Sequence, residues 1–465
     1  MTENSTLQRD GLTVTIVETP SLGDRSYVVD DGTNALVIDP QRDIDRIEQV
    51  LAQRGVQLAG VAETHAHNDY VTGGLELARK AGVPYLVPCE AEVAYERTQV
   101  CDEDVRQVGE MTVRTIGTPG HTPHHVSFAV GRGDAPSLVF TGGSMLFGSV
   151  GRTDLVAPDK TVELTHAQYA SVRRLAGELP GDVAVLPTHG FGSFCSATPT
   201  SGDASTIDQQ REQNPALSQD EEDFVRTLLE GFDAYPAYYA HMGPTNLAGP
   251  APVDLSPVDE ADAEELRRRI AAGEWVVDLR DRTAFARGHV PGTYSFDASG
   301  NMVTFLGWLI PWGTPLTLIG NSPQQVADAQ RELVRIGIDR PAAQATAPIE
   351  ELVDGQELSS FPTATFEDLA AVRKQDPNAL IVDVRRNGEW QDGHIDGALH
   401  IPLHELLGRT DEVPADRPVY VHCAGGFRAT IAASILDAAD KDVTAVIGSF
   451  DEVDDAGLPV SSAGT

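Results

Sequence analysis

Basic residues are scarce in this sequence. Its 465 residues include 34 Lys and Arg against 70 Asp and Glu, which gives a formal net charge of −36, and only four of the basic residues are lysines. An electrostatic field of that sign repels phosphate backbones and anionic lipids. The composition therefore excludes nucleic acid and membrane surfaces as partners, and predicts an acidic surface that keeps the protein in solution.

Long apolar runs and closely spaced cysteines are missing as well. No stretch approaches the ~18–20 apolar residues of a membrane span, and the opening residues MTENSTLQRDGL lack a basic region followed by an apolar one, so we expect a cytoplasmic protein. The four cysteines contain no Cys-x-x-Cys pair, which predicts neither a disulfide framework nor a cysteine zinc site. Cys89, Cys101 and Cys195 are interpreted as ordinary core or surface residues.

A repeat organises the second half of the chain. Residues 275–280 (WVVDLR) recur at 380–385 (LIVDVR), and residues 285–292 recur at 390–397, both at an offset of 105. A constant offset over two blocks indicates duplicated domains. Each copy joins a helical pattern, a short apolar run and a Gly-His-x-x-Gly turn, which is typical of a small α/β domain with a parallel sheet. The helical patterns cover residues 260–271 and 366–372.

The region before the repeat has a different pattern. Short strand-like runs alternate with two helical patterns, which predicts one large mixed α/β domain. The strands are expected at residues 12–17, 26–29, 35–38, 112–115, 127–130 and 137–141, and the helices at 43–54 and 72–81. A proline-rich segment, residues 250–257, marks its end. We therefore predict domains at residues 1–250, 255–345 and 360–465, and call the last two the middle repeat and the C-terminal repeat.

Histidines gather in three loops of the first domain. His65, His67 and Asp69 fall within five residues, and His121 and His189 lie in similar loops rich in Pro, Gly and Thr. Alternate spacing lets His65 and His67 point to one side, and imidazoles beside a carboxylate are the ligands of zinc or iron. One loop histidine is more often a solvated or core side chain, but four of them favour a metal site.

A cysteine in the C-terminal repeat follows an apolar run and precedes a helix. The segment Cys423-Ala-Gly-Gly-Phe-Arg428 can direct backbone N–H groups and a helix N-terminus at the sulfur. With the positive charge of Arg428, that environment stabilises a thiolate nucleophile or a bound anion. The residues of this predicted anion-binding loop are Ala424, Gly425, Gly426 and Phe427.

These motifs resemble persulfide dioxygenases of the metallo-β-lactamase superfamily that are fused to rhodanese domains. The resemblance implies an αββα sandwich followed by two rhodanese-like α/β domains with central parallel sheets. It implies that Cys423 carries sulfane sulfur, with Arg428 assisting, whereas the middle repeat has Gly320 and Gln325 at the equivalent positions and lacks this chemistry. In the segment Gly-Arg152-Thr-Asp, Arg152 is a candidate substrate-binding residue.

Two departures from the superfamily affect the metal site. Tyr70 replaces the last histidine of His-x-His-x-Asp-His, and Gly143 stands where Thr-Gly-Asp would supply a metal-ligating carboxylate. Three arrangements follow: His67 completes a site with His65 and His121 while Asp69 and His189 orient them; Asp69 and His189 hold the metal with another residue; or the site is empty. Restoring the carboxylate by Gly143→Asp is expected to raise iron affinity.

The resemblance favours an enzyme of sulfide and persulfide metabolism. Its substrates would be a low-molecular-weight thiol persulfide or thiosulfate, its cofactor one Fe(II) per chain, or else zinc, and the chain is expected to form a homo-oligomer. A hydrolase of the glyoxalase II type would need two metals, which Tyr70 and Gly143 disfavour. A metal-poor scaffold that binds persulfide is the third alternative.

Overall fold

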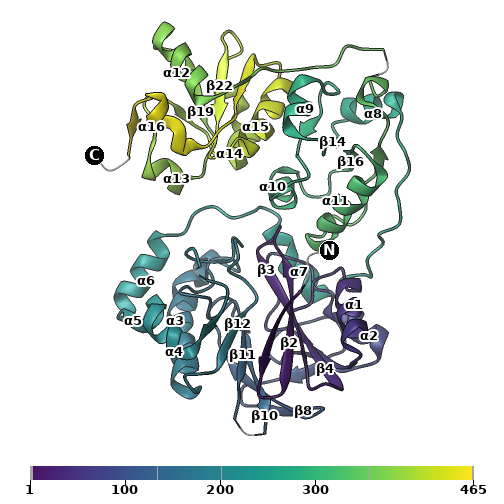
Figure 1. The fold of residues 1–465 in the computed structure, drawn as a ribbon, viewed down its shortest axis with the longest axis vertical. Coiled ribbons are helices and arrows are strands. Elements are labelled where there is room, and N and C mark those ends of the chain that lie inside the picture. The colour runs from purple at the N-terminus through teal and green to yellow at the C-terminus, as the bar shows by residue number, and fades with distance from the viewer. Residues whose placement is uncertain (1–3, 134, 201, 354, 463–465) are drawn as a thin grey trace. The chain divides into compact units, whose positions relative to one another are not determined.

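The computed structural model describes residues 4–462 except 134, 201 and 354, and the chain divides into two compact units (Figure 1). The first unit comprises residues 1–254 and 332–337, and the second comprises 255–331 and 338–465. Among the described residues, no helix is long and apolar enough to cross a membrane.

Two β-sheets form the centre of the first unit. One sheet has the order β1-β2-β3-β4-β5-β6-β7, antiparallel up to β4 and parallel beyond it, and the other has the order β13-β12-β11-β10-β9-β8. The strands of the first sheet are β1 (Ser5–Arg9), β2 (Leu12–Thr19), β3 (Asp24–Asp30), β4 (Asn34–Ile38), β5 (Gln57–Ala62), β6 (Tyr85–Pro88) and β7 (Thr98–Val100). Those of the second are β8 (Val105–Val108), β9 (Met111–Gly117), β10 (Val126–Arg132), β11 (Leu138–Gly142), β12 (Ala184–Pro187) and β13 (Ser205–Thr206).

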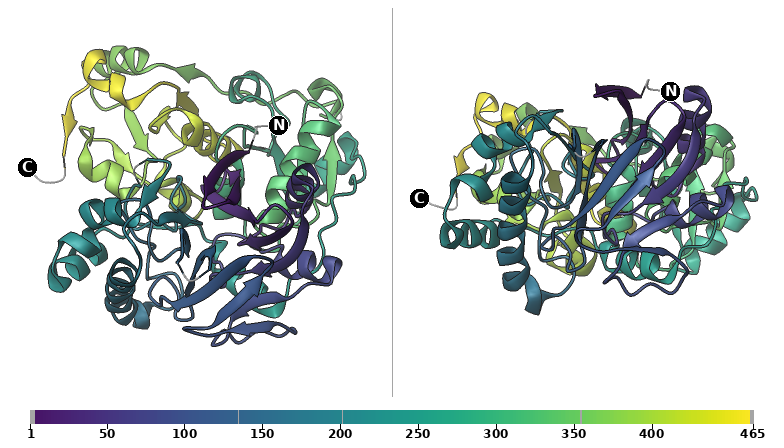
Figure 2. Two further views of the ribbon diagram at one scale, coloured as in Figure 1. Left: turned by 60° about the horizontal axis from the view of Figure 1, so that its bottom comes forward. Right: turned by 90° about the horizontal axis from the view of Figure 1, so that it is seen from below.

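Buried side chains hold these sheets face to face. Tyr27 and Leu36 of the first sheet share one core with Phe128 and Phe140 of the second. Successive residues of a strand point to opposite faces, so each sheet also buries an outer face, which helices cover. The result is an αββα sandwich (Figure 2), as expected from the sequence.

Two helices of the first unit lie where the sequence pattern predicts them. α1 and α2, expected at residues 43–54 and 72–81, pack on the first sheet, and α3 and α6 pack on the second. Their bounds, with those of the shorter helices, are α1 (Asp45–Arg54), α2 (Gly74–Ala81), α3 (Thr161–Glu178), α4 (Ile207–Gln213), α5 (Pro215–Ser218), α6 (Glu221–Glu230) and α7 (Tyr239–Ala248). The sequence pattern therefore predicted α1 and α2, whereas α3 to α7 were not among the predicted helices.

The second unit contains two similar parallel sheets. Their orders are β15-β14-β16-β17 in the middle repeat and β18-β23-β22-β19-β21 in the C-terminal repeat. The strands are β14 (Trp275–Asp278), β15 (Tyr294–Ser295), β16 (Leu316–Ile319), β17 (Ala343–Ala345), β18 (Thr363–Ala364), β19 (Leu380–Asp383), β21 (Leu399–His400), β22 (Val419–His422) and β23 (Val443–Val446), with a separate pair β20 (His394–Ile395) and β24 (Val460–Ser461). The helices are α8 (Ala263–Ala271), α9 (Arg282–Arg287), α10 (Met302–Leu309), α11 (Pro323–Arg335), α12 (Phe366–Gln375), α13 (Asn387–Asp392), α14 (Leu403–Arg409), α15 (Phe427–Ala438) and α16 (Val453–Ala456).

The two repeats also share a hydrogen-bond pattern. Arg280 pairs with Asp278 and donates to the carbonyl of Gly288, and 105 residues later Arg385 pairs with Asp383 and donates to the carbonyl of Gly393. In each repeat, an arginine therefore connects the end of a strand with the end of the next helix. The elements are β14 and α9 in the middle repeat, and β19 and α13 in the C-terminal repeat. Sequence repetition corresponds here to repetition of structure.

One sequence expectation is wrong, because Cys89 and Cys101 form a disulfide. Cys89 follows β6 and Cys101 follows β7, and these two strands pair in parallel. The backbone N–H of Cys89 donates to the carbonyl of Val100, which brings the two Cα atoms to 5.2 Å. Strand pairing, rather than spacing along the sequence, juxtaposes the two thiols.

Candidate functional site

Three imidazoles meet where loops from both sheets converge. His65 follows β5, His121 lies between β9 and β10, and His189 follows β12. All three are buried, and one ring nitrogen of each lies within 4.8 Å of the others. The Nε2 atoms of His65 and His189 are 3.3 Å apart.

Hydrogen bonds at Nδ1 fix the tautomers of His65 and His121. The Nδ1 of His121 lies 2.7 Å from the carbonyl of Arg152, which can only accept, so this nitrogen carries the proton. The Nδ1 of His65 lies 2.8 Å from the hydroxyl of Thr64, whose proton goes to Asp39, so the histidine donates again. Both rings therefore present the lone pair of Nε2, as a metal ligand must.

His189 is oriented by two carboxylates. Its Nδ1 lies 2.9 Å from both Asp24 and Asp69. Burial disfavours the imidazolium, but Asp69 and Asp24 outweigh that effect and raise the pKa of His189 to about 10. Carboxylates on Nδ1 leave Nε2 directed at His65, so a metal ion would take the place of a proton there.

His67 belongs to a different group of side chains. Its Nε2 lies 3.2 Å from Glu63, 3.4 Å from Asp39 and 3.0 Å from the hydroxyl of Tyr70. Burial opposes protonation, but Asp39 and Glu63 outweigh it and raise the pKa of His67 to about 9. The ring is therefore held as an ion-pair partner of the acids, although His67 also forms a second group of possible ligands with Asp69 and His189.

Buried polar atoms without partners support a bound ion at this cluster. An unpaired buried polar atom is costly, so such atoms normally face water or an ion. Those without a hydrogen-bond partner among the described residues include Asp24 Oδ2, His67 Nδ1, Asp69 Oδ1 and His121 Nε2. The residues present therefore fit a metal ion, with the Nε2 atoms of three histidines as the best-prepared ligands.

Gly143 seats His121 instead of supplying a ligand. A Cβ atom at residue 143 would overlap the imidazole of His121, and one at Gly151 would overlap the same ring from another side. The N–H of Gly143 donates to Nε2 of His125, which stacks on His65. Two glycines therefore make the space that the third imidazole ring occupies.

The second candidate site lies in the C-terminal repeat, at the start of α15. Cys423 directly follows β22, and the backbone N–H of Gly426 donates to its Sγ at 3.1 Å. Gly426 has a φ of +86°, a left-handed conformation that glycine adopts without strain. Gly425 is exposed and faces open space, so the loop opens to solvent beside a sulfur that is itself buried.

Arg428 reaches a carboxylate that the motif does not contain. Its guanidinium makes two hydrogen bonds, of 2.6 and 2.7 Å, with Glu389 of α13. Burial opposes ionisation of Glu389, but Arg428 outweighs it and lowers the pKa of the carboxyl to about 2. Glu389 therefore neutralises much of the charge expected to act on Cys423, and holds Arg428 in place.

Comparisons with known proteins match the regions that contain the two sites. The family model of the metallo-beta-lactamase superfamily matches residues 24–189, and that of the rhodanese-like domain matches residues 365–456. The chain joins a metallo-β-lactamase domain to a rhodanese-like domain. The histidine cluster therefore lies in the metallo-β-lactamase domain, and Cys423 lies in the rhodanese-like domain.

The metallo-β-lactamase domain has curated relatives of several kinds. The mitochondrial persulfide dioxygenase of Homo sapiens is 29% identical over 238 residues, which cover 50% of this chain and 79% of the relative. A hydroxyacylglutathione hydrolase of Cupriavidus taiwanensis is 30% identical over 175 residues, which cover 36% of this chain and 62% of the relative. A crystal structure of a metallo-beta-lactamase from Staphylococcus aureus has a TM-score of 0.65 at 25% identity, covering 72% of this chain and 98% of that chain.

Arg152 of the metallo-β-lactamase domain is engaged by protein groups. Its guanidinium forms an ion pair with Asp154 at 2.7 Å, donates to the carbonyl of Asp233 and lies over the rings of Phe232 and Tyr235. The side chain is almost fully buried. The connection of Arg152 to the histidine cluster is its backbone carbonyl, which accepts from His121.

Sequence reasoning missed several residues that orient the two sites. Asp24 lies far from the histidines along the chain, and no motif connects it with His189. His125 could have been noticed, because it follows His121 by four residues in the same loop. Glu389 could also have been noticed, because the equivalent residue of the middle repeat, 105 residues earlier, is Ala284. The carboxylate is therefore present only in the repeat that contains Cys423.

In the middle repeat, the loop that corresponds to the Cys423 loop is filled by the side chain of Gln325. Gln325 accepts from the N–H of Asn321 at 2.7 Å and donates to the carbonyl of Leu279. A Cβ at Gly320 would lie 2.9 Å from Val326 and 3.3 Å from Gln325. This loop therefore has no cysteine nucleophile, and its N–H group at Asn321 is already bonded to Gln325.

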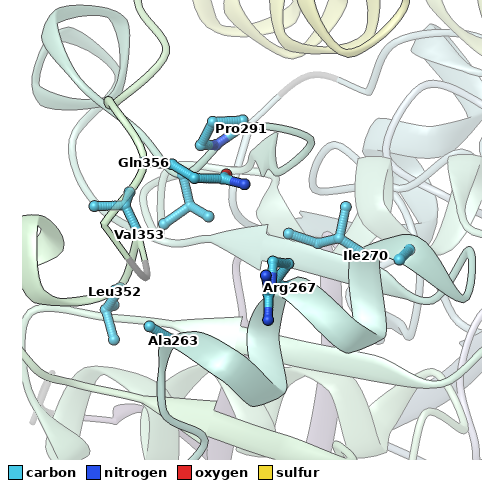
Figure 3. Close-up of a pocket in the computed structure, with 9 residues that line it drawn as sticks. Ala263, Arg267, Ile270, Pro291, Leu352, Val353 and Gln356 are labelled. Carbon is cyan, nitrogen blue, oxygen red and sulfur yellow. The ribbon is translucent and has the colours of Figure 1, made fainter.

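A small cavity of about 170 Å³ is lined by residues of the middle repeat and of the segment that follows it (Figure 3). Its lining is apolar except for Arg267 and Gln356, and includes Ile270 of α8, Pro291 and Val353. None of the predicted site residues lines it, so it takes no part in the two sites described above.

Proposed function

We propose that the protein is a sulfurtransferase of thiol-persulfide metabolism, with Cys423 as the sulfur carrier and a metal centre in the metallo-β-lactamase domain that oxidises a small thiol persulfide. The hydrogen bond from Gly426 to the sulfur of Cys423 carries the proposal, because it prepares the loop for negative charge on sulfur. The rhodanese-like domain and the persulfide dioxygenase relatives support the same chemistry.

The transfer step needs only the thiolate and its loop. The Cys423 thiolate forms a bond to the outer sulfur of thiosulfate, the S–S bond of the donor breaks, and its electron pair leaves with sulfite. Cyanide then takes the outer sulfur as thiocyanate and returns the thiolate. The N–H of Gly426 and the N-terminus of α15 stabilise the negative charge at both stages.

For the metal centre we propose His65, His121 and His189 as ligands of one Fe(II) per chain. These ligands differ from the set of His65, His67 and His121 that the sequence spacing favoured. His67 is replaced by His189 because it pairs with Glu63 and Asp39. Iron would supply the redox chemistry that converts a thiol persulfide, dioxygen and water to a thiol and sulfite. The protein orients the three rings through Arg152, Thr64 and the two carboxylates at His189.

The middle repeat supports a third assignment. We infer that residues 255–345 form a rhodanese-like domain without a catalytic cysteine, between a metallo-β-lactamase domain at 1–250 and the rhodanese domain at 360–465. Support comes from the shared strand order and from the ion pair repeated at an offset of 105 residues.

Mass spectrometry after treatment with thiosulfate tests the transfer chemistry. The peptide that contains Cys423 should gain the mass of one sulfur atom and lose it again to cyanide. Cys423→Ser should abolish both, and Cys195→Ser, at the other free and buried cysteine, is the matched control that should leave both unchanged. Sulfur on a different cysteine, or transfer by Cys423→Ser, would refute the assignment.

A further inference from the structure

The helix that follows Cys423 is buried on all sides. Residues Ala429 to Leu436 of α15 are all buried. One side of the helix contacts β22 and β23 of its own sheet, and another contacts α9 and β15 of the middle repeat. The middle repeat is therefore part of the surroundings of the sulfur site, although its own loop is inactive.

Contacts with the middle repeat occur along the whole of α15. Near the C-terminus, Asp437 accepts from His289 at 3.1 Å, and in the middle, Ser434 accepts from the N–H of Ser295. At the N-terminus, the ring of Phe427 lies 5.9 Å from that of Phe305. These contacts fix the cysteine loop against the middle repeat.

Arg282, the first residue of α9, lies at the mouth of this loop. Its Nη1 is 3.5 Å from the carbonyl of Gly425, and its guanidinium lies over the ring of Phe427 at 5.9 Å. Gly425 is exposed, with open space where a side chain would be, and the neighbouring Gly426 contacts the sulfur. Arg282 therefore stands beside the opening to Cys423.

Arginines gather around this opening. Arg282, Arg386 and Arg428 lie here with three carboxylates: Asp281, next to Arg282 in the chain, Asp297, 3.4 Å from Arg282, and Glu389, which contacts the other two arginines. Three guanidinium groups therefore lie together in a chain whose net charge is −36. The residue equivalent to Arg282 in the C-terminal repeat, 105 residues later, is Asn387. An arginine at this position therefore comes from the middle repeat alone.

We propose that Arg282 is a specificity-determining residue of the sulfur site, through which the cysteine-free middle repeat selects anionic sulfane-sulfur donors for Cys423. The inference rests on the proposed transfer function. Asp297 holds the guanidinium at Nε, and an Nη group at the loop mouth can then bind an oxygen of the donor. The middle repeat thus contributes to the reaction without a nucleophile of its own.

Steady-state kinetics of Arg282→Gln with two donors test this role. Thiosulfate is a dianion, whereas cysteamine persulfide carries an ammonium group. The variant should raise the KM for thiosulfate about threefold to tenfold, the scale of one partly exposed charge-assisted contact, with kcat nearly unchanged. The KM for cysteamine persulfide should not rise, and Arg282→Lys should recover part of the loss. Arg287→Gln, at the exposed end of α9, is the matched control and should behave as wild type.

The outcomes separate this inference from the proposed function. If wild-type Cys423 takes up sulfur and Arg282→Gln keeps the KM of wild type, the specificity role is wrong while the transfer function stands. An equal rise in KM for both donors would also overturn it, because loss of loop structure, not of charge, would then explain the effect. A wild-type chain that takes up no sulfur removes both conclusions.

Discussion

His189 has the central position among the possible metal ligands. It belongs to two groups of side chains that could hold an ion, one with His65 and His121 and one with His67 and Asp69. The first group presents prepared lone pairs, whereas in the second group His67 is tied to Glu63 and Asp39. The behaviour of single variants distinguishes the two.

We expect His189→Ala and His121→Ala to lose the bound metal and His67→Gln to keep it. Glutamine at residue 67 can still donate to the acids, so it tests ligation without leaving buried carboxylates unpaired. Elemental analysis of the purified variants measures the result. Metal retained by His121→Ala but lost by His67→Gln would instead favour the group with Asp69.

Gly143 gives a second prediction, which reverses the expectation from the sequence. A side chain at residue 143 would overlap the ring of His121, so Gly143→Asp must displace a ligand before its carboxylate can serve as one. We expect this variant to bind less metal than wild type, and Gly143→Ala, which adds only the Cβ, to show a similar loss. Tighter iron binding by Gly143→Asp would show that the loop rearranges to accept the family's usual carboxylate.

At the scale of elements, the rhodanese-like domain depends on a link between two helices. Glu389 of α13 and Arg428 of α15 form a largely buried, doubly hydrogen-bonded pair. The pKa of Glu389 is lowered from 4.5 to about 2 in the folded protein. The pair therefore stabilises the fold above the pKa of the unfolded chain, and this stability is lost as the pH falls through 4.5 towards 2.

We expect Glu389→Gln to lower the free energy of unfolding by about 1–3 kcal/mol at about pH 6 and by roughly half of that or less at about pH 3. Urea denaturation at the two pH values measures the difference between variant and wild type. Glu405→Gln, which removes the exposed pair with Arg409, is the control and should cost less than about 1 kcal/mol. An equal loss at both pH values would mean that the carboxylate is not the source of the effect.

Local patterns predicted part of the secondary structure. The strands around Phe128 and Leu36 and the helices α1 and α2 follow from periodicity, because each buries one face against a sheet. The repeat at an offset of 105 predicted that β14 and β19, and α9 and α13, are equivalent. The disulfide between Cys89 and Cys101 was missed because the parallel pairing of β6 and β7 is not visible in the sequence.

Sequence motifs predicted only part of the candidate sites, because contacts between distant segments are not visible in the sequence. Motifs identify the loops of His65, His121, His189 and Cys423, since these loops follow strands. Which imidazoles share an ion depends on how loops from two sheets meet, and one of the acids beside His67, Asp39, comes from the loop after β4. Glu389 likewise reaches Arg428 from another helix, so the charge beside the sulfur was not predictable from the loop alone.

At the scale of the whole molecule, the arginines beside Cys423 contrast with the acidic composition of the chain. The chain carries a net charge of −36, yet the opening beside Cys423 gathers arginines from two repeats. Thiosulfate, the proposed donor, is a dianion, which the overall field repels. On the proposed function, the acidic composition therefore gives the arginines beside Cys423, including Arg282, a larger part in donor selection than they would have in a neutral protein.

The two proposed chemistries can be tested separately, because the histidine cluster and Cys423 belong to different units and share no residue. We expect exhaustive chelation to abolish oxygen uptake with glutathione persulfide while transfer of sulfur from thiosulfate to cyanide stays within about twofold of the untreated rate. Loss of a ligand that binds only the folded state should also lower the melting temperature of the first unit. Readdition of Fe(II) should restore oxygen uptake and thermal stability together. Sulfur transfer that falls in proportion to the metal removed would show that Cys423 depends on the metal centre.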